Sequence, residues 1–114
     1  MSKSQRTKGH NFERWCANKL RTVFPNAMRN VTESQTGGQG VDLINTGAFA
    51  IQCKRYAKYA PIAKIQEVNA PGYWPMLITK GDRSRAMAVL PLDALIAILE
   101  DVGVAYETPD DLPF

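Results

Sequence analysis

The chain has 114 residues, 45% of them hydrophobic, and a formal net charge of +3. This length suits one small domain with a modest core. The polar N-terminus has no apolar signal-peptide segment behind it, and the apolar stretch at 92–99 is too short and too acid-flanked to span a bilayer. Cys16 and Cys53 form no disulfide framework and, with a single histidine, are too few for a zinc site. We therefore expect a cytoplasmic protein without a membrane role or an organic cofactor.

Positive charge is concentrated in the first three quarters of the chain. Residues 1–85 contain all 14 Lys and Arg but only five acids, a net charge of about +9, whereas residues 93–114 contain six acids and no base. A basic region of this kind favours a polyanionic partner such as nucleic acid. The alternative is an ordinary basic surface followed by an acidic tail.

The N-terminal part is predicted to be a flexible basic arm at residues 1–8 and a helix from about Gly9 to Phe24. Apolar residues recur there at helical spacing, and Pro25 follows as a stop signal; they are Phe12, Trp15, Cys16, Leu20, Val23 and Phe24. Glu13 is the only acid among the first 32 residues and lies at the edge of this apolar face. It is either a surface ion-pair partner or a residue aimed at a site.

Three strands are predicted next, at residues 27–33, 41–44 and 48–54. The first two are separated by the glycine-rich loop 34–40, which either brings backbone N–H groups close to phosphates or is a plain linker. This loop lacks the Gly-Lys-Ser/Thr ending of a P-loop. The sequence Asn-Thr-Gly at 45–47 predicts a tight turn, so that the second and third strands form a hairpin.

The predicted hairpin places three polar side chains close together. Side chains two apart in a strand share a face, so Gln52 and Lys54 should point away from the apolar residues Ile51 and Cys53. Asp42 opens the preceding strand. An acid, an amide and an ammonium at the end of two paired strands suit a divalent metal and a phosphate.

The second half of the chain continues this alternation of elements. Bases and tyrosines are interleaved at 55–61, a segment that either meets nucleic acid or is a solvated connection. A short helix is expected at 62–69, strands at 73–79 and 85–90, and a helix from Pro91 to Gly103. Residues 104–114 are expected to be an acidic tail, loose or laid across the surface. The prediction is thus an α/β (α+β) fold in the order αβββαββα, with a single domain at 9–103.

This order and several motifs resemble the PD-(D/E)XK nuclease superfamily. The motif residues are Lys8-Gly9 and Glu13, Gly40-Val41-Asp42-Leu43, and Gln52-Cys53-Lys54. The chain is most similar to the small archaeal-type Holliday junction resolvases and the short, often phage-encoded endonuclease-like proteins related to them. The resemblance covers roughly residues 8–99. It implies a restriction-endonuclease-like core with a mixed central sheet of about five strands flanked by helices.

The resemblance also implies a site for Mg²⁺ or Mn²⁺. Its metal ligands would be Glu13, Asp42, the side-chain oxygen of Gln52 and the backbone carbonyl of Cys53. Lys54 would orient the attacking water and stabilise the phosphate transition state, so that the catalytic set is Glu13, Asp42, Gln52 and Lys54. The residues expected to contact DNA are Lys8, Arg29, Ser34, Gln35, Thr36, Arg55, Tyr56 and Lys58.

The sequence departs from the family pattern at two positions. Val41 replaces the usual proline, which carries no chemistry. Gln52 replaces the usual acid, and a neutral amide is a weaker ligand for a hard cation. A purely structural alternative makes Asp42 a turn cap and leaves Gln52 and Lys54 exposed.

The predicted function is that of a metal-dependent endonuclease that hydrolyses DNA phosphodiester bonds in a bacterial or phage-infected cell, with branched DNA or a Holliday junction as the expected structural preference. Junction resolution would require a homodimer, with Trp74, Met76 or the last helix at its interface. Two alternatives stay open. One is a non-catalytic nucleic-acid-binding protein that retains the nuclease fold, and the other is an interaction protein whose basic face meets an acidic partner.

Overall fold

The N-terminal helix α1 begins earlier than the sequence predicts. In the computed structural model, which describes residues 3–31 and 39–102, α1 spans Lys3–Leu20. Residues 3–8, expected to be a flexible arm, therefore form the first turns of this helix. They contain no glycine or proline, and Lys and Arg are good helix formers, so the helix continues through them although they lack an apolar stripe.

The sheet is mixed and has five strands in the described part of the chain, in the order β1-β2-β3-β4-β5. The strands are β1 (Met28–Arg29), β2 (Leu43–Ile44), β3 (Phe49–Arg55), β4 (Trp74–Lys80) and β5 (Met87–Val89). β3 and β4 pair in parallel along their whole length, and the other neighbours are antiparallel. The predicted α+β fold and mixed sheet are thus confirmed.

The predicted hairpin forms from β2 and β3, with Leu43 opposite Ile51. Asn45 and Gly47 both adopt positive φ in the connecting turn, as a tight turn of this kind requires. The Thr46 hydroxyl donates a hydrogen bond to the Phe49 carbonyl (2.8 Å) and closes the turn. This turn sets the register that decides which β3 side chains face α1.

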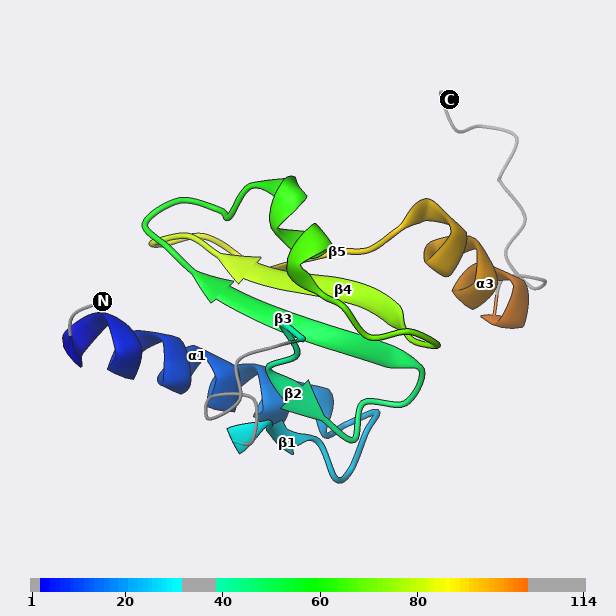
Figure 1. Cartoon of the computed structure of the whole chain (residues 1–114), viewed down its shortest axis with the longest axis horizontal. Helices are drawn as coiled ribbons and strands as arrows, with labels where there is room; N and C mark the ends of the chain where they lie inside the picture. The colour runs from blue at the N-terminus through cyan, green and yellow to red at the C-terminus, as the bar shows by residue number, and fades with distance from the viewer. Residues whose placement is uncertain (1–2, 32–38, 103–114) are drawn as a thin grey trace, which may run out of the picture.

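Helix α1 covers one face of the sheet and packs its apolar side against β3 (Figure 1). The core between them consists of Phe12, Cys16, Ala17, Leu43, Ile51, Cys53 and Ile78. The alternation predicted for β3 is confirmed on this side, since Ile51 and Cys53 lie in that core. Trp15 lies at its rim, 40% exposed and stacked on Phe12 with 5.8 Å between ring centroids.

The opposite face of the sheet carries the short 3₁₀ helix η1 (Ile62–Glu67), which connects β3 to β4. We predicted a longer helix at 62–69 with Ile62 on an apolar side. Instead Ile62 is 70% exposed, and η1 has no buried residue. In a 3₁₀ helix, side chains three apart eclipse one another. The polar contact of η1 with the sheet is made by its last residue, Glu67, which accepts a hydrogen bond from the Gln52 amide of β3.

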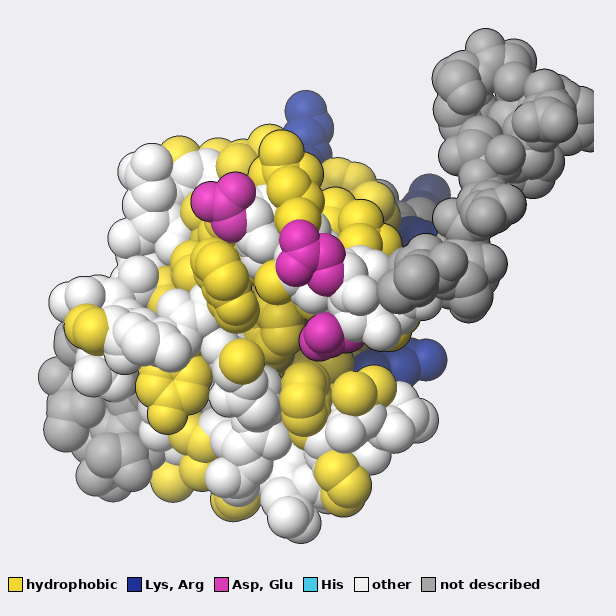
Figure 2. All heavy atoms as spheres, turned by 90° about the vertical axis from the view of Figure 1, so that its right-hand side faces the viewer, with side chains coloured by type: hydrophobic (Ala, Val, Ile, Leu, Met, Phe, Trp, Pro, Cys, Tyr) yellow, Lys and Arg dark blue, Asp and Glu magenta, His cyan; other side chains and the backbone are white. Residues whose placement is uncertain are grey.

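Helix α3 (Leu92–Val102) lies at one end of the molecule, away from the sheet (Figure 1). Of its residues, all of which are described, only Ala94 is buried. The predicted apolar stripe is therefore exposed, and hydrophobic and acidic side chains share this end of the molecule (Figure 2). Among the described residues, no helix has both the length and the apolar character needed to cross a membrane. The predicted tail at 104–114 lies outside the described residues.

Candidate functional site

Asp42 is held at the point where β2 and β3 separate. Its backbone N–H donates to the Ile51 carbonyl, and its carboxylate Oδ2 accepts the backbone N–H of Cys53, both at 2.8 Å. The Asp42 side chain thus adds one more hydrogen bond to β3 beyond the last backbone–backbone hydrogen bond between the two segments. This contact places the Asp42 carboxylate beside the residues of the Gln52-Cys53-Lys54 motif.

A cleft of about 790 Å³ brings most of the predicted site residues together. Glu13 enters it from α1, Asp42 from the segment before β2, and Cys53 and Lys54 from β3. Most of the other lining residues are basic or aromatic: Arg6, Lys8, His10, Arg55 and Tyr56. Two carboxylates and several cations therefore face one concave surface, an arrangement suited to a cation and a phosphate.

Arg6 and His10 were not predicted as site residues. They precede Glu13 by seven and three positions, so all three lie on one side of α1. The missed signal was this spacing, which extends into the residues that we expected to be an arm.

Glu13 forms a largely buried ion pair with Arg29. The Arg29 Nε donates to Glu13 Oε1 at 3.0 Å, and the two side chains are only 16% and 14% exposed. Arg29, predicted to contact DNA, is directed at Glu13 in this structure. Glu13 was predicted as a metal ligand, but in this structure its negative charge is balanced by the Arg29 guanidinium.

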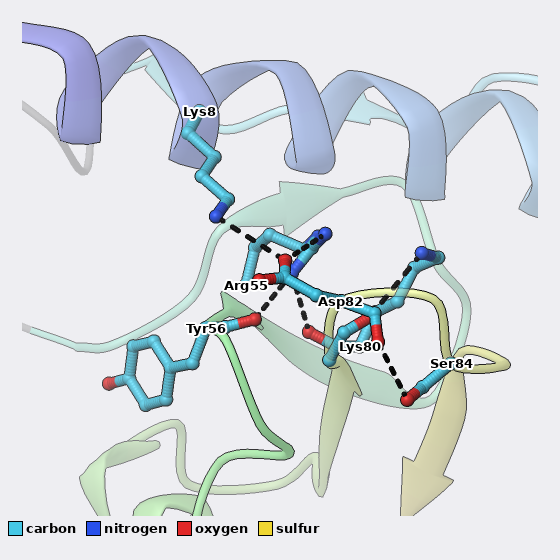
Figure 3. Close-up of polar contacts among 7 residues, drawn as sticks. Lys8, Arg55, Tyr56, Lys80, Asp82 and Ser84 are labelled. Carbon is cyan, nitrogen blue, oxygen red and sulfur yellow. Dashed lines mark hydrogen bonds and ion pairs between the residues drawn. The ribbon is translucent and has the colours of Figure 1, made fainter.

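Asp82 pairs with Lys8 and Arg55, two of the basic residues that line the cleft (Figure 3). Its carboxylate lies 2.8 Å from Nη2 of Arg55 and 3.7 Å from Nζ of Lys8. Arg55 also donates to the backbone carbonyls of Tyr56 and Lys80. The hydrogen bond from Arg55, followed by the charge of Lys8, holds the pKa of the Asp82 carboxyl below its usual value of 3.8. Lys8 and Arg55, which were both predicted to contact DNA, are therefore already paired with one carboxylate.

Gln52 lies on the other face of β3, as the alternation predicts, but it is buried and not exposed. Its side chain is not among those lining the cleft, and the residue is 2% exposed. The amide Nε2 donates to Glu67 Oε1 at 2.9 Å, and Lys54 Nζ lies 3.4 Å from the same oxygen. Gln52 is thus separated from the other predicted catalytic residues, whereas Lys54 both lines the cleft and contacts Glu67.

Glu67, at the end of η1, is a third residue, after Arg6 and His10, that was not predicted from the sequence. Besides Gln52 and Lys54 it pairs with Lys64, whose Nζ lies 2.9 Å from its Oε2. The hydrogen bond from Lys64 is the main reason why the pKa of the Glu67 carboxyl is lowered, although partial burial opposes the shift. No local pattern pointed to Glu67, because only the fold brings η1 over β3.

The Cys53 thiol is not suited to bind a metal. Its hydrogen bond with Cys16 raises its pKa, and burial and the nearby carboxylates of Asp42 and Glu13 raise it further. The thiolate, which is the form that binds metals, is therefore disfavoured. A contribution from Cys53 would have to come from its backbone, as the sequence analysis assumed.

The donor types around the cleft fit a hydrated Mg²⁺ or Mn²⁺ ion. The described residues contain no group of three or more His, Cys, Asp or Glu side chains placed to hold a metal. Mg²⁺, however, keeps several waters and is often bound through one or two carboxylates and the substrate phosphates. Asp42 and Glu13 supply two carboxylates to the cleft, whereas Gln52, whose buried Oε1 has no partner among the described residues, does not line it.

The remaining predicted contacts lie outside this arrangement. Lys58 is exposed beyond the end of β3, two positions after the cleft residue Tyr56, which is 38% exposed. Ser34, Gln35 and Thr36 lie outside the described residues. Comparison with protein-family models, curated proteins and solved structures found no match.

Proposed function

We propose that this protein is a Mg²⁺- or Mn²⁺-dependent endonuclease that hydrolyses phosphodiester bonds of DNA. The observation that carries the proposal is the single cleft in which Glu13, Asp42 and Lys54 converge. Basic residues on the same cleft provide the charge that attracts a polyanionic backbone. The resemblance of the motifs around these three residues to PD-(D/E)XK nucleases supports the same reading.

Each residue has a distinct part in this proposal. Asp42 would be the principal anionic ligand of the cation, and Glu13 would offer a second carboxylate, its charge reduced by the pair with Arg29. A bound divalent ion would supply a hydroxide nucleophile at neutral pH and neutralise the scissile phosphate. Lys54 orients the attacking water and stabilises the charge that develops on the phosphate. Lys8, Arg55 and the exposed Lys58 hold the DNA backbone across the cleft.

A cleavage assay tests this assignment. Purified protein is incubated with duplex, nicked, single-stranded and four-way-junction DNA in the presence of Mg²⁺ or Mn²⁺. Asp42→Asn and Lys54→Ala should each lower the rate by about a hundredfold or more, since each removes a group that acts on the transition state. Asp101→Asn, the same chemical change on the remote helix α3, should have no effect. Equal rates in all four proteins would refute the proposal.

The structural preference is tested in the same experiment. Faster cleavage of the junction than of the duplex would support the resolvase-like specificity that the resemblance implies. Symmetric junction cleavage needs two sites at a fixed separation, and hence a dimer, which light scattering would detect.

A second candidate is a nucleic-acid-binding protein without catalysis. The Glu13–Arg29 pair and the amide at position 52 favour it, because both reduce the negative charge available to a cation. Under this reading Mn²⁺ titration gives no binding, whereas DNA affinity is retained and falls steeply between 50 and 200 mM salt, by about 10³ or more if six phosphates are contacted. Cation-dependent cleavage that is lost in Asp42→Asn would exclude it.

A further inference from the structure

Two hollows in the surface of the molecule share Lys8 and Arg55. One is the cleft that contains the predicted catalytic residues, and the other is a groove of about 560 Å³. The lining of the groove includes four residues of α1 and one residue at the end of each of β3 and β4; they are Lys8, Asn11, Phe12, Trp15, Arg55 and Lys80. Because the same two cations border both hollows, a strand whose phosphate contacts them is placed to enter the groove as well as the cleft.

The charge of the groove favours an anion. Among the described residues, those that line it include three cations, Lys8, Arg55 and Lys80, and no acid. Asp82, which lies outside the lining, pairs with Lys8 and Arg55 and offsets one of these charges (Figure 3). The Lys80 ammonium donates to the Gly81 carbonyl at 3.5 Å and forms no ion pair with an acid in the described part of the chain. The groove therefore keeps a positive charge that suits phosphate groups.

An exposed tryptophan ring adjoins these cations. Trp15 is 40% exposed and is stacked on Phe12, a core residue that holds the ring in place. The exposed Lys19 ammonium lies 5.5 Å from the centre of the Trp15 ring. An exposed cation–π contact of this kind is weaker than the stacking of a base, so a base can displace it. A fixed aromatic ring beside cations matches the two parts of a nucleotide, a flat base and an anionic phosphate.

We propose that this groove binds an unpaired nucleotide of the DNA strand that occupies the cleft. The base packs on Trp15, and the adjoining phosphates contact Arg55 and Lys80. In a duplex each base is already stacked between its neighbours, so an aromatic platform of this kind selects a single strand. The inference rests on the proposed nuclease function and narrows its substrate class to DNA with a single-stranded segment beside the cleavage site.

The test is DNA binding by the full chain in EDTA, measured by fluorescence anisotropy with two labelled ligands. One is a short oligothymidylate, and the other is an abasic strand of the same length, which has the same phosphates but no bases. The wild type should bind the oligothymidylate about tenfold or more tightly than the abasic strand. Trp15→Leu should bind the two equally, because it loses the ring but keeps the cations and an apolar contact with Phe12.

Two further variants separate stacking from a change in folding. Trp15→Tyr keeps an aromatic ring and should retain the preference for the oligothymidylate. Trp74→Leu is the matched control, because Trp74 is similarly exposed (37%) but lines neither hollow, and it should bind like the wild type. Lys80→Gln should weaken both ligands alike and reduce the slope of log affinity against log salt by about one.

A direct readout of the contact does not depend on replacing Trp15. The chain has two tryptophans, so Trp74→Phe leaves Trp15 as the only one. The oligothymidylate should quench the fluorescence of Trp15 in this variant, and the abasic strand should not. Equal affinity of the wild type for the two ligands, absence of quenching, or a preference that persists in Trp15→Leu each overturns the inference.

Failure of the inference can be told apart from failure of the proposed function, because binding is measured without a metal ion. With Mn²⁺, the wild type should cleave a duplex with a single-stranded overhang faster than a blunt duplex, and Trp15→Leu should lose this preference. Cleavage by the wild type with base-independent binding rejects the groove alone. Binding that depends on Trp15, in a protein that cleaves no DNA, rejects the nuclease activity and keeps the groove as a single-strand site.

Discussion

Arg29 and Glu13 illustrate how a single contact changes the reading of a residue. In the sequence, Arg29 is a base in a basic region and was predicted to contact DNA. Glu13 is an isolated acid and was predicted to bind a metal ion. In the structure they contact each other at 3.0 Å and are largely shielded from water. A charge in such a place is tolerated only with its partner, because desolvation must be offset by the pairing. The pair therefore has a structural role next to the cleft.

Replacing Arg29 by Gln should lower the free energy of unfolding by about 2 kcal/mol, since it leaves Glu13 without its partner in a poorly hydrated position. Urea unfolding measures this loss. The double variant with Glu13→Gln should recover part of it, because the two residues are coupled. Arg14→Gln, on the exposed side of α1, is the control. Unchanged stability with weakened DNA binding would instead restore Arg29 to the role predicted from the sequence.

At the scale of elements, the segment before β2 and the end of η1 are joined. The Asn69 N–H donates to the Gln39 carbonyl at 2.7 Å, and Gly40 lies against the Glu67 carbonyl group with φ of +70°. Only glycine adopts this conformation without strain and also leaves room for the neighbouring backbone. This contact links the segment before β2, which carries Asp42, to the 3₁₀ helix η1, which carries Glu67.

Gly40→Ala should destabilise the fold by about 2 kcal/mol or more. The alanine methyl group would overlap the Glu67 backbone, and an L-residue in this conformation is itself strained. Gly72→Ala is a matched control, because Gly72 also has positive φ (+88°) but no atom within 4 Å of an added Cβ. Its cost should be limited to about 1 kcal/mol of backbone strain. Chemical denaturation compares the two, and equal losses would show that the contact with η1 is unimportant.

For the whole molecule, Asp82 connects parts of the chain that are distant in sequence. Lys8 belongs to α1, Arg55 ends β3, and Asp82 lies in the turn between β4 and β5 (Figure 3). The pKa of Asp82 is lowered from 3.8 by these contacts, so the folded state binds the proton less readily than the unfolded state. Its stabilising effect is present above the unfolded value and is lost as the pH falls through the lowered, folded value.

Asp82→Asn should therefore reduce stability at pH 7, and the difference from wild type should shrink as the pH is lowered below 3.8. Thermal unfolding across this range measures the effect, which should be small because Asp82 is half exposed and its ion pairs are screened by solvent. Asp101→Asn, an acid on α3, serves as the control. A difference that does not change with pH would contradict a role for the Asp82 charge.

Local patterns were enough to predict most of the elements. The hairpin follows from its Asn-Thr-Gly turn and from alternation along β3, which also placed Ile51 and Cys53 in the core. The start of α1 was predicted too late, since an apolar stripe marks the buried part of a helix and not its full length. The apolar stripe of α3 predicted a helix correctly but did not tell whether the rest of the chain covers it.

The sequence by itself thus determined the order of elements and the alternation along β3, which puts Ile51 and Cys53 in the core and Gln52 on the other face. These follow from short-range rules of spacing and turn chemistry. Only the tertiary structure decided that Glu13 pairs with Arg29, that Asp82 pairs with Lys8 and Arg55, and that Glu67 contacts Gln52. Such pairings join residues from different elements, so no local pattern along the chain predicts them. For Glu13, Arg29 and Gln52 the physical reason is burial, because a charged or polar group removed from water requires a partner.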